Sequence, residues 1–181
     1  TTPLQLCLMT AQIANGGYKI KPKIIVNDDP SSLEDAKKLM GPQSLRKPNT
    51  RLFKDSKNIK IVQEAMFSST NEQFGTSYRS RIDDPRYQFA GKTGTSQVKR
   101  ISKRERELDL KLEQIPYKDR DHALYVAYGP YKNPRYALSI IVEHGGSGSK
   151  AAAPMAKELF KLIIDRDELR DKQSNFENIN I

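Results

Sequence analysis

The sequence predicts an α+β domain in which three antiparallel strands form a sheet flanked by helices. Three observations support this fold class: a helical pattern at each end of the chain, three strand-like segments in its second half, and a hairpin-length turn between the last two segments. A chain of 181 residues suffices for one ordinary domain or for part of a larger one.

The first helix is expected to start directly after Thr2. Thr2 is a good N-cap, Pro3 suits the first helical position, and Gln5 completes a capping-box pattern. Asn15-Gly16-Gly17 is a stop signal for this helix.

The next segment, 18–26, alternates like a short extended strand, and Pro22 favours an edge position for it. Residues 27–56 are polar and rich in proline, which predicts a surface loop with a helical turn near 33–40. A second helix is expected over 57–69, with one apolar face made by Ile59, Val62 and Met66.

The three strands are expected at 87–98, 123–128 and 136–142, and the last two are joined by the turn at 129–134. A charged loop over 99–121 separates the first strand from the second. A loop of this length inside a compact domain is usually functional or mobile.

A final helix is predicted over 149–165, and residues 166–181 are expected to form a polar, frayed tail. The side chains of this helix expected to face inward are its large apolar ones: Met155, Leu159, Leu162 and Ile163.

The composition restricts the possible functions. The chain has 31 basic and 22 acidic residues, a net charge of +9, which suits nucleic acid, an anionic surface or a carboxylate-bearing polymer. Cys7 is the only cysteine, so an internal disulfide and a cysteine zinc site are excluded. No apolar run is long enough to span a bilayer, and the chain opens without methionine, as expected for a piece of a longer protein.

The segment richest in chemistry is Gly91-Lys92-Thr93-Gly94-Thr95-Ser96. Gly94 removes a side chain between two threonines, so a ligand can approach the backbone closely there. A lysine, two hydroxyls and an open backbone N–H together can bind a carboxylate next to a reacting carbonyl. The same residues also suit a twisted edge strand with exposed hydroxyls.

The context of this segment resembles a known family. Lys-Thr-Gly is one of the motifs of penicillin-binding proteins and their β-lactamase relatives. Over residues 1–165 the chain resembles the C-terminal part of the transpeptidase domain of class B penicillin-binding proteins, and among these the elongation-type penicillin-binding protein 2. The matching segments, in the family's order, are Thr2 to Leu6, Ala14 to Gly17, Lys21-Pro22, Phe89 to Val98, Ile141 to Gly148 and Ala151 to Pro154.

The resemblance implies a function for the triplet. In this family a serine attacks a D-alanyl-D-alanine stem peptide and passes the acyl group to an amine, and β-lactams occupy the same place. By resemblance, Lys92 supplies positive charge and hydrogen-bonds the serine of a Ser-x-Asn motif. The hydroxyls of Thr93 and Thr95 bind the terminal carboxylate, the Thr95 backbone N–H is an oxyanion donor, and Gly94 permits close approach.

The family also implies a larger sheet of five strands. Its Lys-Thr-Gly strand is an outer strand beside the cleft, and its last strand pairs with a strand from the N-terminal half of the domain. We therefore expect the 136–142 strand to have an unpaired edge here, through which the chain could associate.

The nucleophile is expected to lie outside this chain, which should be inactive alone. The resemblance begins downstream of both the Ser-x-x-Lys and Ser-x-Asn motifs, so five matches to these patterns are interpreted as chance: Ser44, Ser96 and Ser147 for the first, and Ser56 and Ser69 for the second. Ser44, for example, lies between two prolines, a poor setting for a buried helix.

The resemblance further implies stem peptides and β-lactams as ligands, elongation-machinery membrane proteins as partners, and the periplasmic face of the bacterial inner membrane as location. No cofactor, metal or nucleic acid is expected. Two alternatives remain: a fragment of a β-lactam sensor or serine β-lactamase, and a non-catalytic nucleic-acid-binding module that uses the basic segment 99–106.

Other residues have less specific interpretations. His144 and Glu143 end a strand, and a structural role is favoured over a metal or acid–base role. Tyr125 is interpreted as a packing residue of its strand. Gly75-Thr76-Ser77 is a candidate for lining the cleft, but no spacing argument places it there.

Overall fold

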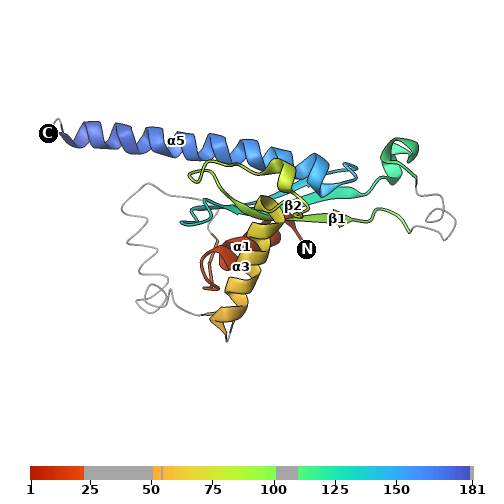
Figure 1. The fold of residues 1–181 in the computed structure, drawn as a ribbon, viewed down its shortest axis with the longest axis horizontal. Coiled ribbons are helices and arrows are strands. Elements are labelled where there is room, and N and C mark those ends of the chain that lie inside the picture. Colours follow the sequence, from red (N-terminus) through yellow and green to blue (C-terminus); the bar gives the residue numbers. More distant parts are fainter. Residues whose placement is uncertain (23–50, 54, 101–109, 180–181) are drawn as a thin grey trace, which may run out of the picture.

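The computed structural model describes residues 1–22, 51–53, 55–100 and 110–179. Three strands form one sheet with helices on both faces, as the sequence predicts (Figure 1). The elements, in chain order, are α1 (Pro3–Ala14), α3 (Ser56–Asn71), η1 (Tyr78–Ser80), β1 (Ala90–Ser96), η2 (Leu112–Gln114), η3 (Tyr117–Asp119), β2 (His122–Gly129), β3 (Tyr136–Val142), the π-helical turn η4 (Gly148–Ala152) and α5 (Ala153–Ile179).

The sheet is antiparallel with the order β1-β2-β3. Thr93 lies opposite Tyr125, and Tyr125 lies opposite Ile140. Because side chains alternate along a strand, these three residues share the face that packs against α5. α1 and α3 lie on the other side of the sheet (Figure 1).

The start of α1 follows the predicted capping box. The Thr2 hydroxyl accepts from the Gln5 backbone N–H at 3.2 Å, and the Gln5 side chain accepts from the Thr2 backbone N–H at 2.8 Å. The helix ends before Gly16 and Gly17, which have φ angles of +86° and +89°. Glycine adopts this left-handed conformation without the steric cost of a Cβ atom.

α3 contradicts one predicted side-chain position. Ile59 and Met66 are buried as expected, but Val62 is 40% exposed. The buried residues of α3 are Ile59, Met66 and Thr70, and with a helix advancing 100° per residue position 63 lies nearer the centre of this face than position 62. Gln63 is half-buried there and donates from its side-chain amide to the Ile13 carbonyl at 2.7 Å, which ties α3 to the end of α1.

The inward face of α5 also differs from the prediction. Met155, Leu159 and Leu162 are 51%, 40% and 66% exposed, and Ile163 is only half-buried. The buried face instead has small residues where the helix approaches the sheet and larger ones further along: Ala152, Ala153, Ala156, Phe160 and Ile164. The prediction chose the large apolar side chains, but only alanines allow the backbone to approach the sheet so closely.

The helix also extends past residue 165, where a frayed tail was predicted, and runs to Ile179. Polar contacts attach this part of α5 to the sheet side of the molecule. Asp167 accepts from Arg135 at 3.0 Å and from the Tyr136 hydroxyl, and Asp165 accepts from the Tyr87 hydroxyl. These partners come from distant segments, so the local sequence could not indicate them.

Several predictions lie outside the described residues: the helical turn near 33–40, most of the loop 27–56, the end of the 18–26 segment, and most of the basic segment 99–106. The described part of the 99–121 loop contains η2 and η3. Among the helices that the structure describes, none is both long and apolar enough to cross a bilayer.

Candidate active site

The predicted substrate strand lies at an edge of the sheet. β1 pairs with β2 on one side, and within the part of the chain that the structure describes no strand covers its other side. Lys92 and Thr95 are exposed, and Thr93 and Gly94 are half-buried. The four residues are therefore brought together on an accessible edge rather than enclosed in the core.

The Lys92 side chain lies along the strand. Its ammonium group donates to the Thr93 carbonyl oxygen at 2.9 Å. A backbone carbonyl is a neutral partner, so the charge of the ammonium is not neutralised by this contact. The strand thus presents a cation at an exposed position of the edge that also carries Thr93 and Thr95.

Two glycines of the segment have different surroundings. A Cβ atom built on Gly94 would lie 3.4 Å from the Leu124 Cβ, close to ordinary contact. A Cβ atom on Gly91 would lie 2.3 Å from the Tyr125 hydroxyl oxygen. Gly91 is therefore needed for the Tyr125 side chain to cross β1, whereas a side chain at Gly94 would meet no close neighbour on the face where its Cβ atom would project.

Tyr125 crosses β1 in order to reach α3. Its ring is fully buried, and its hydroxyl is hydrogen-bonded to the hydroxyls of Thr70 and Ser77, each at 3.0 Å. Burial raises the pKa of the Tyr125 phenol, and the two hydrogen bonds offset part of that rise. Tyr125 is a packing residue, as expected, but its polar contacts with α3 were not predicted.

The turn after α3 is attached to the end of that helix. The Ser77 backbone N–H and hydroxyl both donate to the Ser69 carbonyl, each at 3.0 Å. A Cβ atom on Gly75 would lie 2.4 Å from the same carbonyl oxygen, so only glycine fits there. The backbone on both sides of Thr76 is thereby held in place.

Thr76 contacts β1 directly. Its hydroxyl lies 3.2 Å from the Thr93 hydroxyl and 3.2 Å from the Ser69 hydroxyl. Gly75-Thr76-Ser77 was only a candidate for lining the cleft, since 16 residues separate Thr76 from Lys92 and no periodicity relates them. The sequence signal that could have indicated this contact was a glycine turn rich in hydroxyl side chains directly after a helix.

The serines that match the nucleophile patterns have varied positions. Ser69 bonds to Thr76 as described, Ser147 bonds to the Ser149 hydroxyl at 3.0 Å, and Ser96 is exposed at the end of β1. Ser56 is the first residue of α3, and Ser44 lies outside the described residues.

The two histidines lie together although they are far apart in the sequence. The His144 backbone N–H donates to His122 Nδ1 at 2.9 Å, and His144 Nδ1 lies 3.0 Å from the Arg120 carbonyl. His144 has a φ angle of 55°, in the left-handed region, and these contacts hold its turn. No cluster of three metal-ligating side chains occurs in the described portions of the chain.

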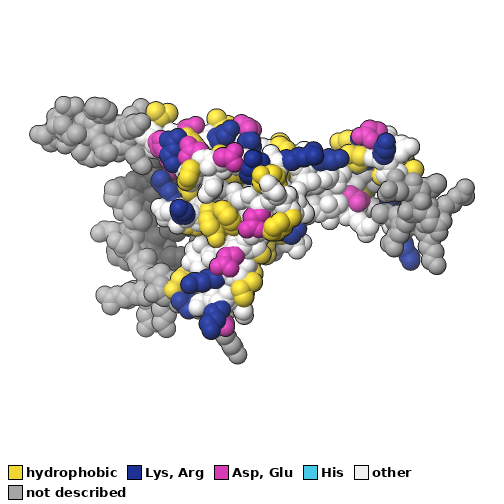
Figure 2. Space-filling view, in the orientation of Figure 1, with side chains coloured by type: hydrophobic (Ala, Val, Ile, Leu, Met, Phe, Trp, Pro, Cys, Tyr) yellow, Lys and Arg dark blue, Asp and Glu magenta, His cyan; other side chains and the backbone are white. Residues whose placement is uncertain are grey.

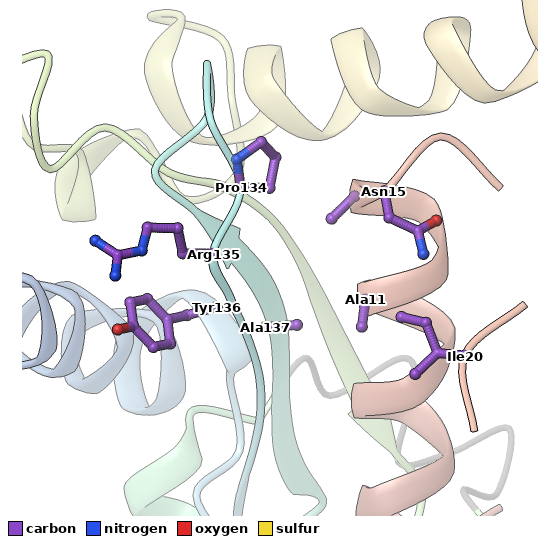
Figure 3. Close-up of a pocket in the computed structure, with 8 residues that line it drawn as sticks. Ala11, Asn15, Ile20, Pro134, Arg135, Tyr136 and Ala137 are labelled. Atoms are coloured by element: carbon purple, nitrogen blue, oxygen red, sulfur yellow. The ribbon is translucent and has the colours of Figure 1, made fainter. Parts of the chain in front are cut away.

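A small pocket of about 150 Å³ lies away from the substrate strand, between α1 and the start of β3 (Figure 3). Its lining includes Ala11, Ile20, Pro134 and Tyr136. None of the four residues of the Lys-Thr-Gly-Thr segment contributes to it.

A match to a known protein family classifies the chain. The penicillin binding protein transpeptidase domain matches residues 1–161. The chain belongs to this transpeptidase family. The helices and the antiparallel three-stranded sheet described above are part of the transpeptidase fold.

Named relatives agree with this classification. The peptidoglycan D,D-transpeptidase MrdA of Salmonella typhimurium is 31% identical over 165 residues, which cover 91% of this chain and 25% of the relative. The penicillin-binding protein PBP2 of Helicobacter pylori, solved in a complex with MreC, matches with a TM-score of 0.63 and 28% identity over 90% of this chain and 25% of that chain.

A second solved structure is similar. PBP2 of Pseudomonas aeruginosa, in complex with WCK 5153, matches with a TM-score of 0.60 and 29% identity over 90% of this chain and 30% of that chain. The transpeptidase chain described here thus spans about a quarter of the length of the relatives it matches.

Proposed function

We propose that this chain is the substrate-binding part of a serine D,D-transpeptidase that cross-links the stem peptides of peptidoglycan and is inhibited by β-lactams. The observation that carries the proposal is the accessible edge strand β1. In a chain of the transpeptidase family it carries Lys92, Thr93 and Thr95 close together in sequence on one edge strand, with Lys92 and Thr95 exposed.

Each residue of the strand has a proposed role. The Lys92 ammonium provides positive charge at the cleft, and the hydroxyls of Thr93 and Thr95 bind the terminal carboxylate of the D-alanyl-D-alanine stem. Gly94, where a Cβ atom would meet only the Leu124 Cβ at 3.4 Å, lets the substrate backbone approach on that face. The Thr95 backbone N–H donates to the oxyanion, a contribution of about 3 kcal/mol to transition-state stabilisation.

The serine nucleophile is proposed to come from a part of the protein upstream of this chain. Its oxygen attacks the penultimate carbonyl, the terminal D-alanine leaves with a proton, and an acyl-enzyme forms. An amine of a neighbouring peptide then displaces the serine. By this account the 181-residue chain binds neither substrate nor penicillin covalently when it is alone.

The partners and the location that we propose are inferred from the related proteins. The Helicobacter pylori PBP2 was solved with MreC, and we propose that this transpeptidase likewise works with membrane proteins of the elongation machinery. Its proposed place is the periplasmic face of the inner membrane, where peptidoglycan is cross-linked. The net charge of +9 suits an anionic polymer or membrane surface.

The test is the reaction of fluorescent penicillin with the full-length protein that contains this chain. Lys92→Ala and Thr95→Val should each lower the second-order acylation rate constant by roughly tenfold or more, because the first removes the positive charge of the cleft and the second removes a hydroxyl that binds the carboxylate. Lys132→Ala is the matched control, since Lys132 is exposed in the turn between β2 and β3, and it should leave the rate unchanged. Equal rates for all three variants would contradict the proposal.

A further inference from the structure

The strongest unexplained feature is a chain of three hydroxyls that ends at the substrate strand. Ser69 Oγ, Thr76 Oγ1 and Thr93 Oγ1 follow one another at 3.2 Å and 3.2 Å. The first hydroxyl belongs to α3, the second to the following turn, and the third to β1. Three separate elements thus converge on one line of hydrogen bonds.

We propose that Thr76 is a positioning residue for the carboxylate subsite, and that it acts by orienting the hydroxyl of Thr93. This inference rests on the proposed function, in which Thr93 binds the terminal carboxylate of the substrate. It adds a residue to that subsite from outside the Lys-Thr-Gly-Thr strand.

The three hydroxyls can pair with a bound carboxylate in only one direction of hydrogen bonding. A hydroxyl has one proton, and a carboxylate only accepts. When Thr93 donates its proton to the carboxylate, its oxygen must accept from Thr76, and the oxygen of Thr76 must then accept from Ser69. The bound anion therefore sets one direction for the whole chain, from Ser69 through Thr76 to Thr93.

Such an ordered series of hydrogen bonds makes its last hydroxyl, that of Thr93, a stronger donor. Hydrogen bonds in series polarise one another, so Thr93 is a better donor to an anion when its oxygen accepts from Thr76. Both O···O separations, 3.2 Å each, are longer than is usual for hydroxyl pairs, so the three hydroxyls can move closer together when an anion binds. A Thr93 hydroxyl without Thr76 would rotate freely and lose this bias.

The backbone that carries the Thr76 hydroxyl is held firmly by its neighbours, as a positioning role for Thr76 requires. Ser77 is 1% exposed and Thr70 is fully buried, and both are hydrogen-bonded to the Tyr125 hydroxyl. Thr76, in contrast, is exposed at the rim. A pre-organised backbone that carries an accessible hydroxyl is the arrangement expected for a residue that orients a substrate-binding group.

The test measures acylation of the full-length protein by benzylpenicillin and by its methyl ester, which lacks the carboxylate. Thr76→Val keeps the shape of the side chain and removes the hydroxyl, and should lower the rate constant for benzylpenicillin about tenfold with little effect on the ester. Thr76→Ser restores the hydroxyl and should restore the rate. If Thr76→Val fails to fold, Ser69→Ala supplies the same comparison with a smaller expected fall, about threefold.

A double variant separates positioning from a general structural effect. In a Thr93→Val background, Thr76→Val should cause no further fall for benzylpenicillin, because Thr76 acts through Thr93. An equal fall for penicillin and ester, an undiminished fall in the Thr93→Val background, or no fall at all would overturn the inference. Failure of the unsubstituted protein to react would overturn the proposed function as well, so the two failures are distinguishable.

Discussion

At the scale of single residues, two glycines of β1 serve different purposes. Gly91 leaves space for Tyr125, whose hydroxyl oxygen would lie 2.3 Å from a Cβ atom at that position. A Cβ atom at Gly94 would meet only the Leu124 Cβ, at 3.4 Å. The first glycine is required by the packing of the protein, and the second is, by our proposal, a point of close approach for the substrate.

We therefore predict that two similar substitutions have opposite consequences. Gly91→Ala should reduce the free energy of unfolding by roughly 1–3 kcal/mol, because the methyl group overlaps the buried phenol. Gly94→Ala should change stability by less than about 0.5 kcal/mol, yet slow penicillin acylation of the full-length protein. Urea denaturation and fluorescent-penicillin kinetics of both variants provide the comparison. A stable Gly91→Ala protein would show that Tyr125 can move aside.

At the scale of elements, α5 is held to the sheet by a narrow face. Phe160 is fully buried, and its ring stacks on that of Phe89 with centroids 4.9 Å apart. Leu162, two residues later, is 66% exposed. Burial rather than hydrophobicity therefore distinguishes the two positions.

Truncating these two side chains should have very different costs. Phe160→Ala is expected to reduce the free energy of unfolding by about 3–5 kcal/mol, because it leaves a cavity against Phe89. Leu162→Ala is expected to cost less than about 0.5 kcal/mol. Thermal or denaturant unfolding of the two variants measures the difference. Similar costs would indicate that the exposed face of α5 is also packed.

The elements themselves were largely predictable from sequence, and their contacts less so. Thr2 and Gln5 form a local capping signal, and the start of α1 follows it. The third strand was predicted at 136–142, which are its bounds in the structure. The prediction of the inward face of α5 was wrong, because alanines give only a weak hydrophobic signal in the sequence and their burial depends on the sheet beneath them. Thr76 could not be assigned, because its partners Ser69 and Thr93 come from two other elements.

At the scale of the whole molecule, the described part of the sheet has open edges and uncovered apolar side chains. β3 pairs only with β2 among the described residues, and Ile141 on it is 39% exposed. Hydrophobic side chains reach the surface over α3 (Figure 2), where Ile61 is 61% exposed. We propose that other parts of the transpeptidase domain cover these surfaces in the full-length protein.

The isolated chain should consequently associate with itself. An unpaired strand edge can pair with the same edge of another copy. Sedimentation velocity is expected to show dimers or larger species that increase with concentration. Ile141→Lys, which adds a charge on the edge strand, should shift the chain toward monomer. Monomeric behaviour of the unsubstituted chain at high concentration would count against this proposal.

The proposed function depends most on the division between a substrate-binding strand in this chain and a nucleophile outside it. The most direct measurement is mass-spectrometric mapping of the penicillin adduct on the full-length protein, with the 181-residue chain treated in parallel. We predict one penicilloyl group on a serine upstream of Thr1, and no adduct on the isolated chain. An adduct on a serine within the 181 residues, such as Ser69 or Ser96, would contradict the account.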